Sequence, residues 1–187
     1  MPSKAILFDL DGTLTDNRVG ITGGCMAAQK AMGLPVSARE ELYCFIGPPL
    51  VEAFMEKWDL TRAQALEALA HYRAYYEKQG IFENVPYAGI HSLLTRLKEA
   101  GARLYVATSK PEPSSLKILE RFELLPYFDG VAGSLLNETR TKKSEVLQYA
   151  LEHFALSKTS SLMVGDRNHD VEGASAVGLP CVGVLYG

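Results

Sequence analysis

Four short polar runs have residue types and spacing suited to chemistry on a charged substrate, and the first is the run from Asp9 to Asp16 (DLDGTLTD). Asp9 and Asp11 stand two residues apart directly after an apolar stretch, so their side chains can project toward the same space. Gly12 lets the backbone turn sharply and brings N–H groups close to an anion. These features favour a ligand site over a solvated Asp-Gly turn.

The second run is Thr108-Ser109-Lys110, which follows the apolar residues Leu104–Ala107. A hydroxyl, backbone donors and an ammonium group at the end of a strand suit a phosphate oxygen. Taken alone, this run is also typical of an ordinary helix start.

The third run is the pair Lys142-Lys143, just before a helical pattern that starts at Val146. A lysine supplies a point charge both to a phosphate and to a neighbouring carboxylate. Because cations at a helix amino terminus oppose the macrodipole, a functional reason for at least one of the two lysines is favoured over a solvated pair.

The fourth run is Gly165–Asp170 (GDRNHD), directly after the apolar stretch Ser161–Val164. Asp166 and Asp170 are four residues apart, so a helical turn would stack them on one face. Carboxylate and carbonyl oxygens suit a hard cation such as Mg²⁺, which commonly also contacts substrate phosphate. The ordinary alternative for Asp170 is a helix N-cap.

The elements that must position these runs alternate between strands and helices. Short apolar runs typical of buried parallel strands lie at Ala5–Phe8, Leu104–Ala107, Gly130–Ala132, Ser161–Val164 and Cys181–Leu185. Amphipathic helical patterns separate them, including Ile90, Leu93, Leu94 and Leu97. The alternation predicts an α/β fold with a parallel sheet covered by helices on both faces. Ligands of such sheets bind beyond the carboxyl ends of the strands, where all four runs fall.

One stretch breaks the alternation, from about residue 17 to about residue 85. It shows helical patterns and no convincing strand, and Thr61 with Gln64 resembles a capping box. The helix that follows carries Leu66, Leu69, Tyr72 and Tyr76 on one face. We expect a core of residues 1–15 and 87–187, with residues 16–86 inserted as an all-helical subdomain.

Composition excludes several classes of protein. The chain has 187 residues, 47% hydrophobic and 22% charged, which is typical of a globular protein rather than a disordered or coiled-coil one. The formal net charge of −3 offers no electrostatic footprint for a nucleic acid polymer or an anionic membrane. Three scattered cysteines and the lack of a signal-peptide or membrane-span pattern favour a cytoplasmic location.

The four runs together resemble the motifs of the haloacid-dehalogenase-like hydrolase superfamily. The similarity is strongest to its phosphoglycolate-phosphatase-like subgroup and covers essentially the whole chain. It rests on FDLDGTLTD (8–16), IGPPL (46–50), VATSKP (106–111) and VGDR (164–167). The resemblance implies a Rossmann-like core with a helical cap of the C1 type, and Mg²⁺-dependent hydrolysis of a small phosphorylated metabolite.

The resemblance also implies roles for individual residues. Asp9 would be the nucleophile that forms an aspartyl-phosphate, and Asp11 would protonate the leaving oxygen and then activate water. Mg²⁺ on Asp9 would keep that group ionised and leave Asp11 free to carry the proton. The remaining assignments are phosphoryl binding by Thr108 with the backbone of Gly12 and Ser109, charge neutralisation by Lys143 (with Lys142 as the alternative), and a metal site of Asp9, Asp11 through its carbonyl, Asp166 and, in support, Asp170.

Several alternatives stay open at the level of sequence. The substrate could be phosphoglycolate, a nucleotide or a sugar phosphate, and a sugar-phosphate mutase would use the same acid/base pair. A non-catalytic binding module on the same fold is a third hypothesis. The subgroup usually adds a further strand and helix beyond Cys181–Leu185, so we expect an exposed sheet edge at that run.

Overall fold

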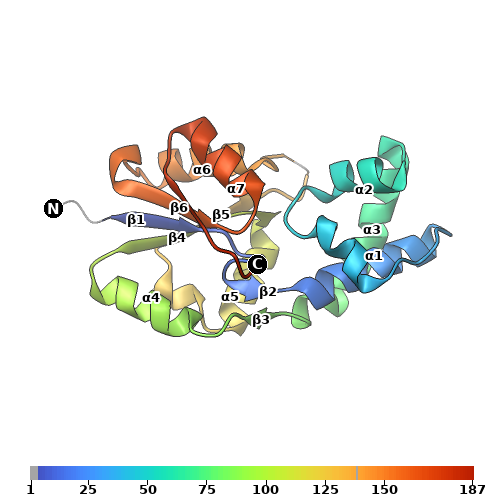
Figure 1. Ribbon diagram of the computed structural model, residues 1–187, viewed down its shortest axis with the longest axis horizontal. Coiled ribbons are helices and arrows are strands. Elements are labelled where there is room, and N and C mark those ends of the chain that lie inside the picture. The colour runs from blue at the N-terminus through green and yellow to red at the C-terminus, as the bar shows by residue number, and fades with distance from the viewer. Residues whose placement is uncertain (1–3, 138) are drawn as a thin grey trace. The chain divides into compact units, whose positions relative to one another are not determined.

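The computed structural model describes residues 4–137 and 139–187, and the chain divides into two compact units (Figure 1). The core unit takes its described residues from 4–16 and 86–187, and the helical unit comprises residues 17–85. Two short strands, β2 (Thr15–Asp16) and β3 (Val85–Pro86), pair with each other where the chain leaves the core unit and returns to it.

A five-stranded parallel sheet forms the centre of the core unit, with the strand order β5-β4-β1-β6-β7. Its strands are β1 (Ala5–Phe8), β4 (Arg103–Pro111), β5 (Gly130–Ser134), β6 (Ser161–Gly165) and β7 (Cys181–Gly183). β1 is central because it is apolar on both faces, and Leu7 pairs in register with Tyr105 on one side and Met163 on the other. The strand ends that carry the polar runs therefore lie side by side.

Helices cover both faces of this sheet, α4 and α5 on one face and α6 and α7 on the other (Figure 1). They are α4 (Ile90–Glu99), α5 (Glu112–Arg121), α6 (Lys143–His153) and α7 (Asn168–Val177), with short 3₁₀ turns at η3 (Leu125–Tyr127) and η4 (Lys158–Ser160). The predicted α/β class with a helix-covered parallel sheet is confirmed.

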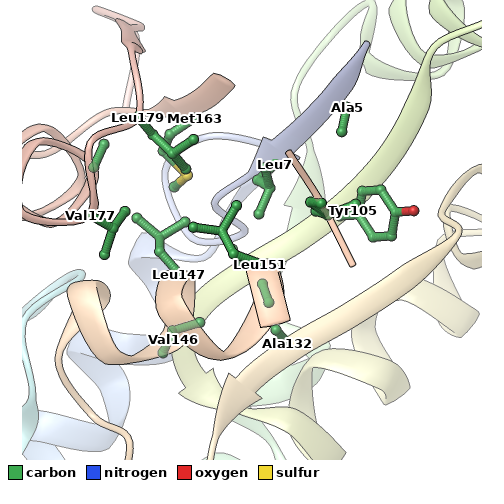
Figure 2. Close-up of a cluster of buried hydrophobic side chains, with 14 residues drawn as sticks. Ala5, Leu7, Tyr105, Ala132, Val146, Leu147, Leu151, Met163, Val177 and Leu179 are labelled. Atoms are coloured by element: carbon green, nitrogen blue, oxygen red, sulfur yellow. The ribbon is translucent and has the colours of Figure 1, made fainter. Parts of the chain in front are cut away.

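The main apolar core lies between the sheet and the helices α6 and α7 (Figure 2). Alternate residues of the strands point into it, Leu7 from β1 and Met163 from β6, and they meet Leu147 and Leu151 of α6. Phe8 points to the opposite face and packs edge-to-face with Phe128. Burial on both faces fixes the register of β1, and the register fixes where Asp9 emerges.

The helical unit consists of α1 (Arg18–Ala31), η1 (Arg39–Phe45), α2 (Leu50–Trp58), α3 (Arg62–Lys78) and η2 (Gly80–Phe82). The predicted capping box at the start of α3 is confirmed, because Gln64 N–H donates to the Thr61 hydroxyl and the Gln64 side chain accepts from the Thr61 N–H. Its core is aromatic, with Phe54 stacked on Trp58 at 4.3 Å and Tyr72 on Tyr76 at 5.5 Å between ring centroids.

Several details of the sequence-based expectations were wrong. Leu66 and Leu93 are exposed rather than core residues, because each lies at the margin of its helix's apolar face. β4 also continues beyond Ala107 to Pro111, with a shift in register over that stretch, so Thr108–Lys110 lie in an irregular part of the strand rather than after it. Within the residues that the structure describes, we find no helix with the length and apolar character of a membrane span.

Candidate functional site

The side chain of Lys143 joins three elements of the core unit. Its ammonium Nζ lies 2.8 Å from Asp9 Oδ1 and 2.8 Å from Asp170 Oδ1, and it donates to the Ala107 carbonyl at 3.0 Å. Three oxygens thus match the three N–H donors of an ammonium group. All three of the ionic side chains are buried. Burial opposes the charge on Lys143, but the two carboxylates outweigh it and raise the pKa of the ammonium.

Asp11 has a cationic partner of its own. Lys110 Nζ donates to Asp11 Oδ2 at 2.6 Å, and both side chains are nine-tenths or more buried. The second oxygen, Oδ1, is buried and accepts no hydrogen bond. Burial raises the pKa of the Asp11 carboxyl, the neighbouring Asp9 adds to the rise, and Lys110 opposes it. Asp11 is therefore more ready to carry a proton than a solvated aspartate is.

The turn that follows β1 brings Asp11 back toward the sheet. The N–H groups of Leu14 and Thr15 donate to the Leu10 carbonyl, and Gly12 N–H donates to the Thr15 carbonyl. Gly12 has φ of 87°, and a Cβ at this position would collide with the Asp166 carboxylate. Only glycine satisfies both the left-handed backbone and the close approach.

The turn is bonded to the end of β6 as well. Thr13 Oγ1 donates to Asp166 Oδ1 at 3.0 Å, and Arg167 Nε lies 3.2 Å from Asp166 Oδ2 without pointing at it. These contacts hold the Asp166 carboxylate next to the turn that carries Asp11.

Asp170 occupies the first turn of α7, whereas Asp166 lies before that helix, so the two are not stacked on one helical face as expected. Asp170 Oδ2 accepts the Arg167 N–H at 3.1 Å, which caps the helix, and Oδ1 faces Lys143. Gly165 leaves the space for this side chain, because a Cβ there would collide with the Asp170 carboxylate. The N-cap position itself belongs to Arg167, so the alternative of Asp170 as the N-cap is wrong; Asp170 is the third residue of α7, bonds back to the N-cap N–H and also faces Lys143.

Asp9, Asp166 and Asp170 each offer a carboxylate oxygen within 4.8 Å of the others. Burial raises the pKa of Asp166 to about 6, and the charges of Asp9 and Asp170 add to this. Asp166 Oδ2 is buried and accepts no hydrogen bond. Close, partly unsatisfied oxygen donors that repel one another are a set that fits a hard divalent cation.

Thr108 and Ser109 lie in the irregular stretch of β4, on the strand that neighbours β1. The Thr108 side chain is buried and its Oγ1 accepts the Lys110 N–H at 3.2 Å, while Ser109 is half-buried. Bulges of this kind commonly re-aim side chains beside active sites.

The residues singled out from the sequence thus converge at the carboxyl ends of the core strands. Of the two candidate lysines, only Lys143 is buried there. Lys142 is exposed and begins α6. Three contacts were not predicted: the ion pair of Lys110 with Asp11, the bond from Thr13 to Asp166, and the bond from the Tyr186 hydroxyl to the Thr13 carbonyl at 2.9 Å. Lys110 and Thr13 lie inside runs already marked as polar, whereas Tyr186 carries no local signal.

Such an arrangement can combine nucleophilic and acid/base chemistry. Two neighbouring carboxylates meet different environments, Asp9 with the buried Lys143 and Asp11 with Lys110 and a raised pKa. Pairs of titratable groups separated in this way are typical of sites that divide the roles of nucleophile and proton donor.

The sequence is similar to those of known proteins. Residues 6–184 match the family model of the haloacid dehalogenase-like hydrolases. A 5'-nucleotidase of Pseudomonas aeruginosa is 43% identical over 182 residues, which cover 97% of this chain and 82% of that protein. The tyrosine-protein kinase PtkA of Mycobacterium tuberculosis is 39% identical over 189 residues, 98% of this chain, and the chain spans only 62% of that protein's length.

Solved structures show the same similarity. The crystal structure of a predicted phosphatase from Clostridium acetobutylicum superposes with a TM-score of 0.97 at 42% identity, covering 99% of this chain and 86% of that one. The resemblance seen in the sequence motifs is confirmed. The chain belongs to the haloacid dehalogenase-like hydrolase family and is one of its phosphoric monoester hydrolases, acting on a phosphorylated substrate.

Proposed function

We propose that this chain is a Mg²⁺-dependent phosphatase that hydrolyses a small phosphorylated metabolite through a phosphorylated Asp9. The observation that carries the proposal is the position of Lys143 between Asp9 and Asp170, with the Asp166 carboxylate in the same cluster. The Lys143 ammonium, 2.8 Å from Asp9 Oδ1, holds the buried carboxylate in one orientation, which attack on phosphorus requires.

In the first half of the reaction, the Asp9 carboxylate attacks phosphorus and the bond to the leaving oxygen breaks. The Asp11 carboxyl, protonated at Oδ1, gives its proton to that oxygen, and the free alcohol departs. Support for this role comes from the raised pKa of Asp11 and from Oδ1 having no hydrogen-bond partner, whereas Oδ2 is engaged by Lys110.

In the second half, the Asp11 carboxylate takes a proton from water, whose oxygen attacks the phosphorus of the aspartyl-phosphate. The bond between phosphorus and the Asp9 oxygen breaks, which restores the Asp9 carboxylate and releases phosphate. Asp11 ends the cycle protonated, as it began. The same side chain serves as acid and then as base because its environment holds its pKa above that of a solvated aspartate.

Cationic and neutral donors offset the charge of the phosphoryl group. The Lys143 ammonium neutralises part of the charge at Asp9, and the Thr108 hydroxyl with the backbone N–H of Ser109 binds phosphoryl oxygens. Such donors lie in a buried site, where each one stabilises the transition state more than it would in water. The Gly12 N–H, which we expected to take part, instead donates to the Thr15 carbonyl at 2.8 Å.

Asp9, Asp166 and the Asp11 carbonyl would hold Mg²⁺, and Asp170 would orient Lys143, since both of its oxygens already have partners. The ion supplies electrostatic attraction that lets a negatively charged nucleophile approach a negatively charged phosphate. The fit rests on carboxylate oxygens of Asp9 and Asp166 that lie within 4.8 Å of each other, on Asp166 Oδ2 having no hydrogen-bond partner, and on the raised pKa of Asp166.

The helical unit is proposed as the cap that selects the substrate. Its loop Gly47-Pro48-Pro49 is stiff because two successive prolines fix φ, and we propose it as a specificity element. Among phosphoglycolate, sugar phosphates and nucleotides, nucleoside 5'-monophosphates are the first substrates to assay, because a relative with 43% identity is a 5'-nucleotidase.

The test is a panel of phosphorylated metabolites assayed with Mg²⁺ and with EDTA, for the unaltered protein and for Asp9→Asn. We expect phosphate release only with Mg²⁺ and only when Asp9 is present. Borohydride reduction of protein quenched during turnover should convert residue 9, and no other aspartate, into homoserine, since it reduces an acyl phosphate.

Asp59→Asn is the matched control, because Asp59 is exposed and its left-handed backbone suits asparagine equally well. Full turnover by Asp9→Asn, or turnover that EDTA does not reduce, would contradict the proposal. Product analysis separates the alternatives: an isomerised sugar phosphate without free phosphate indicates a mutase, and metabolite binding without any turnover indicates a binding module.

A further inference from the structure

The residues that follow β7 lie across the site end of the core sheet. Val184 N–H donates to the Gly165 carbonyl at 2.9 Å, immediately before Asp166. Gly187 lies so close to the Gly12 carbonyl and the Asp166 side chain that a Cβ there would collide with both. The segment 184–187 therefore contacts both the turn after β1 and the end of β6.

Two tyrosines hold consecutive carbonyls of that turn. The Tyr186 hydroxyl donates to the Thr13 carbonyl at 2.9 Å, and the Tyr87 N–H donates to the Leu14 carbonyl at 3.1 Å. Their rings pack together, with centroids 4.7 Å apart and an angle of 60° between the planes. Two residues distant in the sequence thus hold the backbone of the turn in place.

Thr13 links the two tyrosines to the cluster of carboxylates, because its own hydroxyl donates to Asp166 Oδ1 at 3.0 Å. We propose that Tyr186 is a positioning residue of the metal site: by holding the Thr13 carbonyl, it keeps the Thr13 hydroxyl on Asp166 and keeps Gly12 and Asp11 in place beside it. The inference rests on the proposed function in one respect, namely that Asp166 and Asp11 hold Mg²⁺.

A role of Tyr186 in stability alone and a role at the metal site predict different effects of removing its hydroxyl. Tyr186 is 49% exposed but Thr13 is buried, so loss of the Tyr186 hydroxyl leaves the Thr13 carbonyl without a partner, and a role in stability alone predicts a lower midpoint of unfolding with unchanged Mg²⁺ affinity. The turn itself, however, becomes less ordered in the metal-free protein. Metal binding must then supply the ordering that the hydrogen bond supplies now, so the affinity for Mg²⁺ falls as well as the midpoint of unfolding.

The test is Tyr186→Phe in the full chain, which removes the hydroxyl and retains the ring that packs on Tyr87. Titration calorimetry measures the Mg²⁺ dissociation constant, and hydrogen exchange measures protection of the amides of residues 12–15 in metal-free protein. We expect the dissociation constant to rise about fivefold, the equilibrium factor that corresponds to one neutral hydrogen bond, and those amides to exchange faster by a similar factor.

Tyr127→Phe is the matched control. The Tyr127 hydroxyl also takes part in one hydrogen bond, which it accepts from Thr95, but it lies before β5, at the opposite end of the sheet. This control should leave both measurements unchanged. A Tyr186→Phe protein with unchanged Mg²⁺ affinity and unchanged exchange overturns the inference, and so does an equal loss in the control.

Failure of the proposed function gives a distinct result. If neither the unaltered protein nor Tyr186→Phe binds Mg²⁺, the proposed metal site is wrong. Faster exchange of residues 12–15 in Tyr186→Phe would then still support the restraint of the turn, and unchanged exchange would overturn that restraint as well.

Discussion

The core unit and the helical unit bury different kinds of side chain. The core unit buries Asp9, Asp11, Lys143 and Asp170 at the carboxyl ends of its strands. In the helical unit, residues 17–85, every Asp, Glu, Lys and Arg is at least partly exposed, and the largest fully buried side chains include Phe45 and Phe54. Its ion pairs, such as Lys57 with Glu56, lie on the surface.

This difference separates stability from chemistry. Burying a charge is costly unless it is paired, so the core unit retains its ionic cluster in spite of the cost to folding, as expected of a reactive site. The helical unit buries uncharged and mostly apolar side chains, which is the ordinary, stabilising pattern. Substitutions in the ionic cluster should therefore change both the reaction and the fold, whereas substitutions in the aromatic cluster should change the fold alone.

The largest effect is expected from Lys143→Met, which removes the shared cation of Asp9 and Asp170. Loss of a charge that stabilises the transition state should lower kcat by roughly 10³-fold. Breaking a buried ion pair leaves uncompensated carboxylates and should cost about 3–5 kcal/mol in the free energy of unfolding. Steady-state assays and urea denaturation measure the two effects.

Lys142→Met is the control for that substitution. Lys142 is exposed, so its loss should change stability by no more than about 0.5 kcal/mol and leave kcat intact. If the two variants behaved alike, the assignment of Lys143 to the site would be wrong.

The aromatic cluster offers the reverse experiment, Phe54→Ala. Phe54 is fully buried between Phe45, Trp58 and Tyr72, so truncation should cost about 3–5 kcal/mol. Trp58 is the single tryptophan, so its fluorescence reports on the unfolding of the helical unit. The Mg²⁺ affinity of the remaining folded protein should not change, because the candidate ligands all lie in the core unit.

An Mg²⁺ affinity that fell together with the fluorescence signal would show that the two units do not divide stability and chemistry as described. Equal stability of Phe54→Ala and the unaltered protein would show that the aromatic cluster is not the core of the helical unit.

The fold could be predicted from sequence wherever periodicity was strong. Ala5–Phe8 has the bounds predicted for it because four consecutive apolar residues allow burial on both faces. Leu93 and Leu66 could not be placed correctly, because helical spacing marks a face and does not tell where its margin meets solvent. The register shift at the end of β4 is a property of two strands together and leaves no local pattern.

The site could be predicted as far as local runs and strand ends define it. Asp9, Asp11 and Asp166 follow strands that pair or neighbour one another, so their proximity follows from topology. Contacts between two such runs could not be predicted: Lys110 reaches Asp11 across 99 residues, and Tyr186 reaches Thr13 across 173. These depend on side-chain conformations that sequence spacing does not fix.

Lys110→Met tests the less central of the two buried lysines. We expect a decrease in kcat of about 10- to 100-fold, because Asp11 loses the partner that orients Oδ2 and keeps Oδ1 available for proton transfer. Since Lys110 lowers the pKa of Asp11, its loss should shift the pH–rate profile of the variant toward higher pH. Lys110→Arg, which keeps the charge, should retain the profile. A profile identical in all three proteins would assign Lys110 a structural role only.

The pH dependence of Mg²⁺ binding gives the smallest and most specific test. The pKa of Asp166 is about 6 in the folded protein against an ordinary value of 3.8, so from about pH 4 to pH 6 the folded state holds a proton that the unfolded chain has released. This group therefore makes the metal-free protein less stable as pH rises through that window.

Mg²⁺ reverses that trend because it requires the ionised carboxylate. Below about pH 6, each decrease of one pH unit should weaken Mg²⁺ binding about tenfold, since one proton must leave Asp166 before the metal binds. Above pH 6 the affinity should level off. The rise in Tm that Mg²⁺ produces should accordingly be larger at pH 7 than at pH 5. Asp166→Asn should lack this dependence, and its persistence in that variant would move the proton to a different member of the cluster.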